Sequence, residues 1–236
     1  MKQFFLNRNV GNNYGFFNAY YFISLFFCFV ICFAIVINKT KIRKIIRNKQ
    51  KWIRILFGSF LLIAWFLRRG SFIWYDVYNW RHHLDINFCS MTNIMMILYC
   101  FTGDKRLYVL CYYLIFSGPL IAILFPSINS SIFNYSTINF FIIHHVIFIF
   151  NLVFFLFESP NYNRRDMIVS HILIVFYVLF TYLFNYIFQT NYNTLQSFIN
   201  NSFIVPDVIS IVILFSVNSL CIVFAGFVFN KLELRG

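Results

Sequence analysis

Residues 18 to 54 read NAYYFISLFFCFVICFAIVINKTKIRKIIRNKQKWIR, an apolar run of about twenty residues followed directly by a basic segment that contains no acid. An apolar run of this length is enough for one α-helix to cross the hydrocarbon core of a bilayer. The basic segment, Lys39 to Arg54, holds eight Lys or Arg residues, and such residues beside a membrane helix favour the cytoplasmic side. This stretch therefore predicts a membrane helix that ends in the cytoplasm.

Apolar runs separated by short polar segments continue along the rest of the chain. With 61% hydrophobic and 11% charged residues and a mean hydropathy of +0.73, the composition is that of a protein within a bilayer. We predict an all-α, polytopic membrane helix bundle of about seven transmembrane helices, with residues 1–236 forming a single integral membrane domain. The predicted spans are residues 18–37, 54–74, 86–102, 107–125, 137–157, 167–187 and 207–229.

The distribution of basic residues predicts the orientation. Fourteen of the nineteen Lys and Arg residues fall on one side of the seven-span pattern and five on the other. Because the richer side is usually cytoplasmic, we expect the N-terminus outside and the C-terminus in the cytoplasm of a multi-pass protein of the cell membrane. These loops explain the net charge of +12, so we expect no nucleic-acid partner. Instead, Lys39 to Arg54 should contact anionic lipid headgroups.

Two predicted spans contain an interruption. Arg68 and Arg69 stand near the end of the second span, where we expect the helix to leave the hydrocarbon near Leu67 with the arginines reaching outward. In the fourth span, Gly118 and Pro119 should kink or break the helix, because proline removes a backbone donor and crowds the preceding turn.

The sequence offers little support for metal or nucleotide chemistry. Its six cysteines lie inside predicted spans without the paired spacing of a zinc site. We interpret His82, His83 and Asp85 as ordinary interfacial polarity. No nucleotide-binding loop, HExxH zinc motif or GxSxG nucleophile turn occurs in the sequence. We therefore expect no metal and no cofactor, and we disfavour ATP hydrolysis, zinc-dependent proteolysis and serine-hydrolase chemistry.

Polar side chains within the third span need hydrogen-bonding partners, and they indicate either helix packing or function. Cys89 and Asn93 are four residues apart and share one helix face, while Asn87 and Ser90 lie three apart on a neighbouring face. Hydrogen bonds between helices and a reactive site are both compatible with this pattern.

The fifth span contains adjacent histidines, His144 and His145, roughly 10 to 12 Å from its outer end at 1.5 Å per residue. Asn151 lies seven residues after His144 and on the same face, so we expect His144 to point into the bundle. We assign His145 to packing or to an interface. A buried imidazole can serve as a structural hydrogen-bonding group or can handle protons.

Three segments carry a resemblance to a known family. Leu84 to Cys89 reads LDINFC, Asn139 to His144 reads NFFIIH, and Asn185 to Tyr192 reads NYIFQTNY. In this order they resemble the YwaF family of bacterial integral membrane proteins, although Asp85 and Asn87 replace its Pro and His, and Gln189 replaces its Gly. The biochemistry of that family is largely undefined. The resemblance also implies a distant similarity to eukaryotic membrane proteins that are lipid acyltransferases or lipid ester hydrolases.

Three classes of function remain open. In the first, an intramembrane thiol enzyme acts on lipid acyl esters, with Cys89 as nucleophile and His144 as base. Residues that could orient the substrate or stabilise an oxyanion are Asn87, Asn93, Asn185, Asn191 and Tyr192. The second class is a permease or channel for small solutes, and the third is a non-catalytic membrane scaffold whose polar residues hold helices together.

Overall fold

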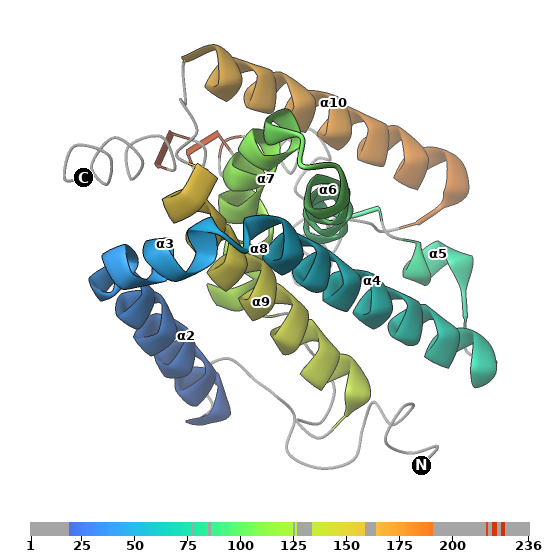
Figure 1. Ribbon diagram of the computed structural model, residues 1–236. Helices are drawn as coiled ribbons and strands as arrows, with labels where there is room; N and C mark the ends of the chain where they lie inside the picture. The colour runs from blue at the N-terminus through green and yellow to red at the C-terminus, as the bar shows by residue number, and fades with distance from the viewer. Residues whose placement is uncertain are drawn as a thin grey trace.

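The computed structural model of the chain is built from helices (Figure 1). It describes residues 19–76, 78–84, 86–124, 126, 134–158, 164–190, 216, 219–220 and 223–224. The helices are α2 (Ala19–Ile37), α3 (Lys39–Arg47), α4 (Gln50–Trp74), α5 (Trp80–His83), α6 (Phe88–Thr102), α7 (Lys105–Ser117), α8 (Pro119–Leu124), α9 (Tyr135–Glu158) and α10 (Arg164–Phe188). All regular structure among these residues is therefore helical, as predicted.

Several helical stretches in the described part of the chain are long and apolar enough to cross a membrane. There are five: Ala19–Ile37, Gln50–Trp74, Lys105–Leu124, Thr137–Phe155 and Arg165–Phe188. They correspond to the first, second, fourth, fifth and sixth predicted spans. The protein thus has the apolar helices of a multi-pass membrane protein.

The other predicted spans have different outcomes. Helix α6, the third, has 15 residues and is about 22 Å long at 1.5 Å per residue, which is shorter than a hydrocarbon core of about 30 Å. Asn87 begins this helix and Gly103, with φ of 72°, ends it, so capping residues at both ends limit its length. Residues 207–229, the seventh predicted span, lie almost entirely outside the described residues.

Helix α4 continues past Leu67 without interruption and ends only at Trp74. Each arginine near its end lies over an aromatic ring. The guanidinium carbon of Arg69 is 5.0 Å from the ring centre of Trp65, and that of Arg68 is 5.9 Å from the ring centre of Phe72. Aromatic faces attract cations through the ring quadrupole, so these arginines are held beside the helix by its own side chains.

The predicted break at Gly118 is confirmed. Helix α7 ends at Ser117, Gly118 has a non-helical backbone (φ −114°, ψ −81°), and α8 begins at Pro119. A Cβ atom on Gly118 would lie 3.1 Å from the backbone N of Cys89 and 3.2 Å from the Cβ of Phe88. Glycine therefore allows the break to lie directly against the first turn of α6.

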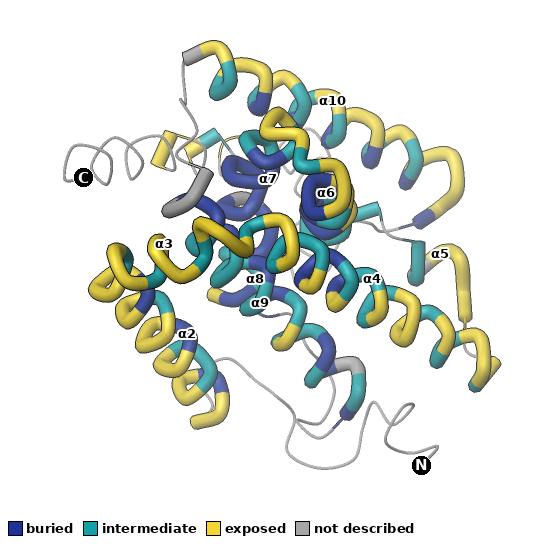
Figure 2. The backbone as a smooth tube through the Cα atoms, viewed as in Figure 1, coloured by how far each residue is buried: buried dark blue, intermediate teal, exposed yellow. Residues whose placement is uncertain are grey.

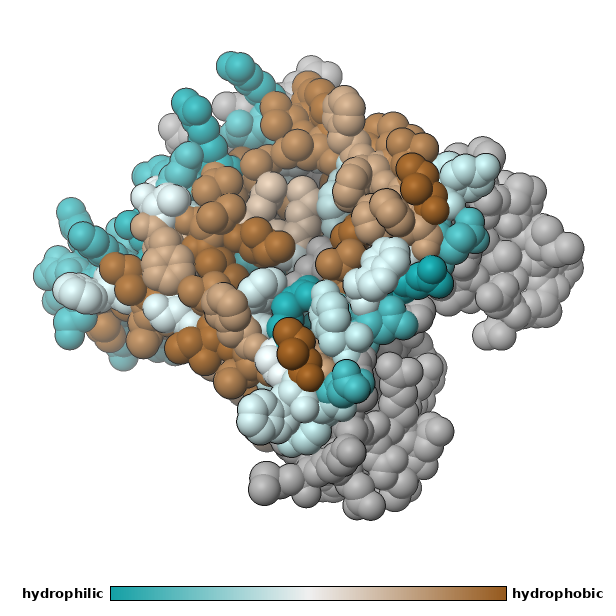
Figure 3. Space-filling view, turned by 90° about the vertical axis from the view of Figure 1, so that its right-hand side faces the viewer, coloured by the Kyte–Doolittle hydropathy of each residue, from teal (hydrophilic) through white to brown (hydrophobic). Residues whose placement is uncertain are grey.

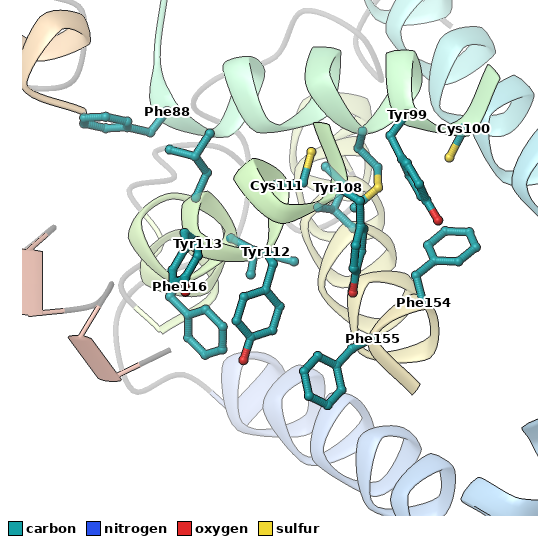
Figure 4. Packing of buried hydrophobic residues seen from close by; sticks show 14 of the residues in the cluster. Phe88, Tyr99, Cys100, Tyr108, Cys111, Tyr112, Tyr113, Phe116, Phe154 and Phe155 are labelled. Carbon is teal, nitrogen blue, oxygen red and sulfur yellow. The ribbon is translucent and has the colours of Figure 1, made fainter. Parts of the chain in front are cut away.

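An aromatic core in the described part of the chain is shared by α6, α7 and α9. Tyr99, Tyr108 and Phe154 converge there (Figure 4), and all three side chains are fully buried. The phenol of Tyr108 donates a hydrogen bond of 3.0 Å to the carbonyl O of Asn151. This bond satisfies a polar group that would otherwise be costly to bury.

The helices at the periphery of the bundle each leave one face exposed. Figure 2 shows α7 largely buried, whereas α2, α4 and α10 each carry a long exposed stripe. On α2, large apolar residues such as Phe26, Phe29 and Phe33 are exposed. Hydrophobic side chains also cover much of the face in Figure 3, with a smaller hydrophilic patch among them. Apolar surface of this extent is suited to contact with lipid.

Candidate functional site

Cys89 lies in the first turn of α6 and is half-buried. Asn87, which we expected to bind substrate, is the N-cap of this helix: its side-chain oxygen accepts a hydrogen bond of 2.8 Å from the backbone N of Ser90. Such a cap satisfies one of the backbone donors left without partners at a helix start. Asn87 therefore fixes where α6 begins and, with it, where the thiol of Cys89 lies.

His144 is buried in α9, with 7% of its surface exposed. Its Nδ1 lies 2.6 Å from the carbonyl O of Phe140. Because a carbonyl oxygen can only accept, Nδ1 must carry the proton, and in the neutral ring Nε2 then has the lone pair. The prediction that His144 points inward is confirmed, and the local bonding leaves Nε2 as its basic atom.

His145 has a different role, and it agrees with the predicted one. Its Nδ1 lies 2.7 Å from the carbonyl O of Phe141, and its Nε2 lies 3.1 Å from the hydroxyl of Ser24 on α2. By the same argument Nδ1 is the donor, so Nε2 accepts from the serine hydroxyl. This bond joins α9 to α2 and is a packing contact.

Arg68 lies near both predicted catalytic residues. Its positive charge, near the end of α4, lies within Coulombic range of both Cys89 on α6 and His144 on α9. Helix α8, which follows the Gly118 break, packs against both α6 and α9. The thiol and the imidazole therefore belong to the same end of the bundle, where α4 ends and α6 begins.

The remaining predicted residues divide into three groups. Asn93 is buried, and within the described residues its Oδ1 has no hydrogen-bond partner. Asn185 closes the end of α10, since its Oδ1 accepts a hydrogen bond of 2.8 Å from the hydroxyl of Thr190. Asn191 and Tyr192 lie outside the described residues. Asn93 thus has an unused acceptor deep in the bundle, while the Oδ1 of Asn185 has a structural partner.

A small pocket lies at the same end of the bundle, and the sequence did not predict it. It has a volume of about 40 Å³ and is lined by Trp65, Arg68, Arg69, Phe72, His83, Leu84 and Asn87. His83, interpreted above as ordinary interfacial polarity, stacks on Phe72 with ring centres 4.4 Å apart. The only sequence signal was the pair of arginines within an otherwise apolar span. The described residues contain no group of His, Cys, Asp and Glu side chains that could hold a metal ion.

Together, the apolar helices and the polar site at their ends define the class: a multi-pass membrane protein. A family model describes almost the whole chain, since the model of the TMEM164 family matches residues 13–229. The chain belongs to the TMEM164 family. No curated protein and no solved structure shows a significant match to it.

The predicted resemblance to the YwaF family is therefore wrong. It rested on three short segments, Leu84 to Cys89, Asn139 to His144 and Asn185 to Tyr192, each rich in residues that any apolar helix end contains. The structure gives Asn87 and Asn185 ordinary helix-end roles, and such roles recur in unrelated helices. The family match extends over residues 13–229 and does not depend on these segments alone.

Proposed function

We propose that this protein acts on the acyl esters of membrane lipids, with the thiol of Cys89 as nucleophile and the imidazole of His144 as base. The observation that carries the proposal is the bonding of His144, whose Nδ1 is committed to Phe140 and whose Nε2 is therefore the basic atom. Support also comes from the position of the two residues, since both lie near Arg68 at the end of α4. A base with a fixed tautomer and a cysteine at a helix start form the usual pair for nucleophilic catalysis.

The proposed chemistry has two half-reactions. As the Cys89 sulfur attacks the ester carbonyl, its proton passes to Nε2 of His144. The ester C–O bond then breaks, the departing alkoxide takes that proton, and a thioester remains on Cys89. In the second half-reaction a hydroxyl group, from water or from a lysolipid, gives its proton to His144 and attacks the thioester carbonyl. The C–S bond then breaks, the Cys89 sulfur takes the proton back from His144, and the acyl group leaves as an acid or a new ester.

The polar residues near the thiol would orient the ester. Asn93 lies one helical turn after Cys89, and its unused Oδ1 could accept a hydrogen bond from the hydroxyl that attacks the thioester. Asn87 would donate from its side-chain NH₂ group, because its Oδ1 already accepts the hydrogen bond of the helix cap. Asn185, Asn191 and Tyr192, from the end of α10 and the segment after it, remain proposed binding residues.

For the arrangement in the membrane, we propose seven crossings with the N-terminus outside and the C-terminus in the cytoplasm of the cell membrane. The five long apolar helices support this number together with α6 and the apolar residues 207–229. In this topology the Cys89 end of α6 faces outward.

Helix α3 is the part of the basic segment that we propose to lie on anionic lipid. Ile42 and Ile46, one turn apart, are half-buried, whereas the basic side chains of Arg43 and Lys44 are exposed. An apolar stripe beneath a basic face is typical of a helix that lies at a membrane surface. Each basic residue near anionic headgroups would add roughly 1 kcal/mol to this contact.

The test uses the full chain in phospholipid vesicles that contain a lipid labelled in its acyl chain. We expect labelled fatty acid or a labelled new ester to form, and Cys89→Ser and His144→Ala to reduce its rate at least about a hundredfold. Cys32→Ser and His171→Ala are matched controls, since Cys32 lies on α2 and the Nδ1 of His171 has the same type of backbone bond (2.9 Å to Met167) on α10.

The alternatives predict other results. A permease would show solute flux that responds to cavity-lining changes but no acyl product. A scaffold would tolerate Cys89→Ser without any change. Folded wild-type protein that yields no acyl product from any phospholipid class would contradict the proposal.

A further inference from the structure

Two buried amide side chains, one on α6 and one on α9, each have an atom without a hydrogen-bond partner among the described residues. These atoms are Oδ1 of Asn93 and Nδ2 of Asn151. Only 5% of the Asn93 surface and 2% of the Asn151 surface is exposed. A buried polar atom that gives up water and gains no partner destabilises the fold. Both atoms therefore need a partner that the described protein groups do not supply.

The two atoms have opposite hydrogen-bonding roles. The side-chain oxygen of Asn93 can only accept, and the side-chain nitrogen of Asn151 can only donate. They do not satisfy each other, since neither has a partner within hydrogen-bond distance among the residues that the structure describes. A single molecule that both donates and accepts would satisfy both atoms.

The helices that carry these amides run side by side in the same direction. Cys89 on α6 and His144 on α9 both lie near Arg68. Ten residues further along each helix, Tyr99 and Phe154 lie against each other (Figure 4), with ring centres 5.4 Å apart. Contacts at both positions with the same spacing show that α6 and α9 are in register between them.

Asn93 and Asn151 both lie between these two levels. Asn93 is four residues after Cys89, and Asn151 is seven residues after His144. The two amides therefore differ in height by about 4.5 Å, at 1.5 Å per residue. A water molecule that bonds to two groups joins atoms about 5 to 6 Å apart, which is twice the length of one hydrogen bond. This offset suits one bridging molecule rather than a direct bond between the amides.

Helix α7 contacts the backbone beside both amides. The phenol of Tyr108 donates a hydrogen bond of 3.0 Å to the carbonyl O of Asn151. Three residues later, the thiol of Cys111 lies 4.0 Å from the carbonyl O of Thr92, the residue before Asn93. One turn of α7 therefore lies against both sites, which places the two amides beside each other.

The surroundings of the amides favour a small neutral ligand. Met96, three residues after Asn93, and Ile147, four residues before Asn151, are both fully buried. An ion would lose its hydration in such apolar surroundings. Water is uncharged and is both a donor and an acceptor, and ordered water is a common partner of buried polar atoms that have no protein partner.

We propose that Asn93 and Asn151 bind one internal water molecule, which donates to Oδ1 of the first and accepts from Nδ2 of the second. The water joins α6 to α9 and so fixes the spacing of the helices that carry Cys89 and His144. Because an amide oxygen has two lone pairs, Oδ1 of Asn93 can also accept from the hydroxyl in the proposed acyl transfer. The inference goes beyond that proposed function and does not depend on whether Cys89 reacts.

The experiment is X-ray radiolysis of the full chain in phospholipid vesicles, in which hydroxyl radicals form from bound water and oxidise the side chains beside it. Oxidised peptides are quantified by mass spectrometry. Tyr108 is the reporter, since it is fully buried and bonds to the backbone of Asn151. Tyr113, which is also on α7 and 2% exposed, is the matched control. We expect Tyr108 to be oxidised at least about tenfold faster than Tyr113.

Asn93→Leu and Asn151→Leu keep the approximate size of each side chain and remove its polar atoms, so each should lower the oxidation rate of Tyr108 to that of Tyr113. Asn139→Leu changes another buried asparagine of α9, twelve residues before Asn151, and should leave the rate unchanged. Tyr108 that is oxidised no faster than Tyr113 in folded wild-type protein overturns the proposal, and this comparison needs no variant to fold. Fast oxidation that persists in either variant of the pair also overturns it, because the water would then not bridge the two amides.

Discussion

The aromatic core and the end of the bundle that carries Cys89, the outer end in the proposed topology, are built in opposite ways. In the core, Tyr99 and Phe154 pack with ring centres 5.4 Å apart and both are fully buried. At the outer end, where α4 stops and α6 begins, Arg68, His83 and Asn87 surround a pocket. The core provides stability through dense packing, whereas the outer end retains charge, donors and open space. The candidate site therefore lies at helix ends, whereas the core is filled by packed rings.

Strained backbone conformations also occur at helix ends rather than in the aromatic core. In the described part of the chain, the non-glycine residues with positive φ are Asp76 and Gln189, both at 53°. Asp76 follows the end of α4, and Gln189 follows the end of α10. This conformation costs a residue with a Cβ atom about 1 kcal/mol or more. Strain of this kind often accumulates at functional sites, where it is retained because the surrounding structure requires it.

The largest effect on stability is expected in the core. Phe154→Ala should lower the free energy of unfolding by about 3 to 5 kcal/mol, because it removes a ring buried against Tyr99 and Tyr108. Unfolding in mild detergent, followed by circular dichroism, measures the change. Arg69→Gln at the outer end should cost less than about 1 kcal/mol. Equal losses for the two variants would remove the distinction between the regions.

A smaller loss is expected where Gly58 of α4 lies against Cys100 of α6. A Cβ on Gly58 would lie 2.6 Å from the Cβ of Cys100, so Gly58→Ala must move one helix and should cost about 1 to 3 kcal/mol. Cys100→Gly removes the opposing atom. The double variant should therefore lose less than the sum of the single losses, which a double-mutant cycle measures. Additive losses would show that the clash between residue 58 and Cys100 is not the cause of the loss in Gly58→Ala.

At the outer end, Asn87→Ala should cost only about 1 kcal/mol of stability, since it removes the cap of α6. Its effect on the proposed acyl transfer should be larger than this loss implies, because the cap positions the first turn that carries Cys89. Asn87→Asp retains a capping oxygen and should preserve stability. Turnover that falls in Asn87→Ala only in proportion to the folded fraction would contradict a positioning role.

The smallest effect is a gain. Gln189→Gly should raise the free energy of unfolding by up to about 1 kcal/mol, because glycine adopts φ of 53° without steric cost. The variant also loses the hydrogen bond of 2.9 Å from the Gln189 side chain to the carbonyl O of Tyr186, which is exposed and contributes little. A thermal unfolding midpoint that decreases would show that the turn after α10 is not strained.

Much of the fold could be predicted from local patterns. Apolar length identified the long helices, and the pair Gly118 and Pro119 located the break. The seven-residue spacing between His144 and Asn151 identified which histidine points inward, since helical periodicity relates residues within one helix. The third predicted span, residues 86–102, ends where α6 ends but begins two residues too early, because the cap Asn87 places the start of the helix at Phe88.

The pocket could not be predicted, for a different physical reason. Its walls come from α4, α5 and the start of α6, and local sequence patterns relate residues within one helix but do not show which helix ends meet. Asn87 and Asn185 were predicted to bind substrate, while the structure uses their side-chain oxygens to close helix ends. Polar residues at helix ends serve as caps so often that their chemistry alone does not assign a role.

The most direct test of the proposed function is to look for an acyl group on Cys89 of the protein. The full chain is incubated in vesicles with a lipid labelled in its acyl chain, the reaction is stopped with acid, and peptides are analysed by mass spectrometry. We predict a hydroxylamine-sensitive acyl thioester on Cys89 that is lost in His144→Ala and retained in His171→Ala. A label on another cysteine, or folded wild-type protein without any label, would contradict it.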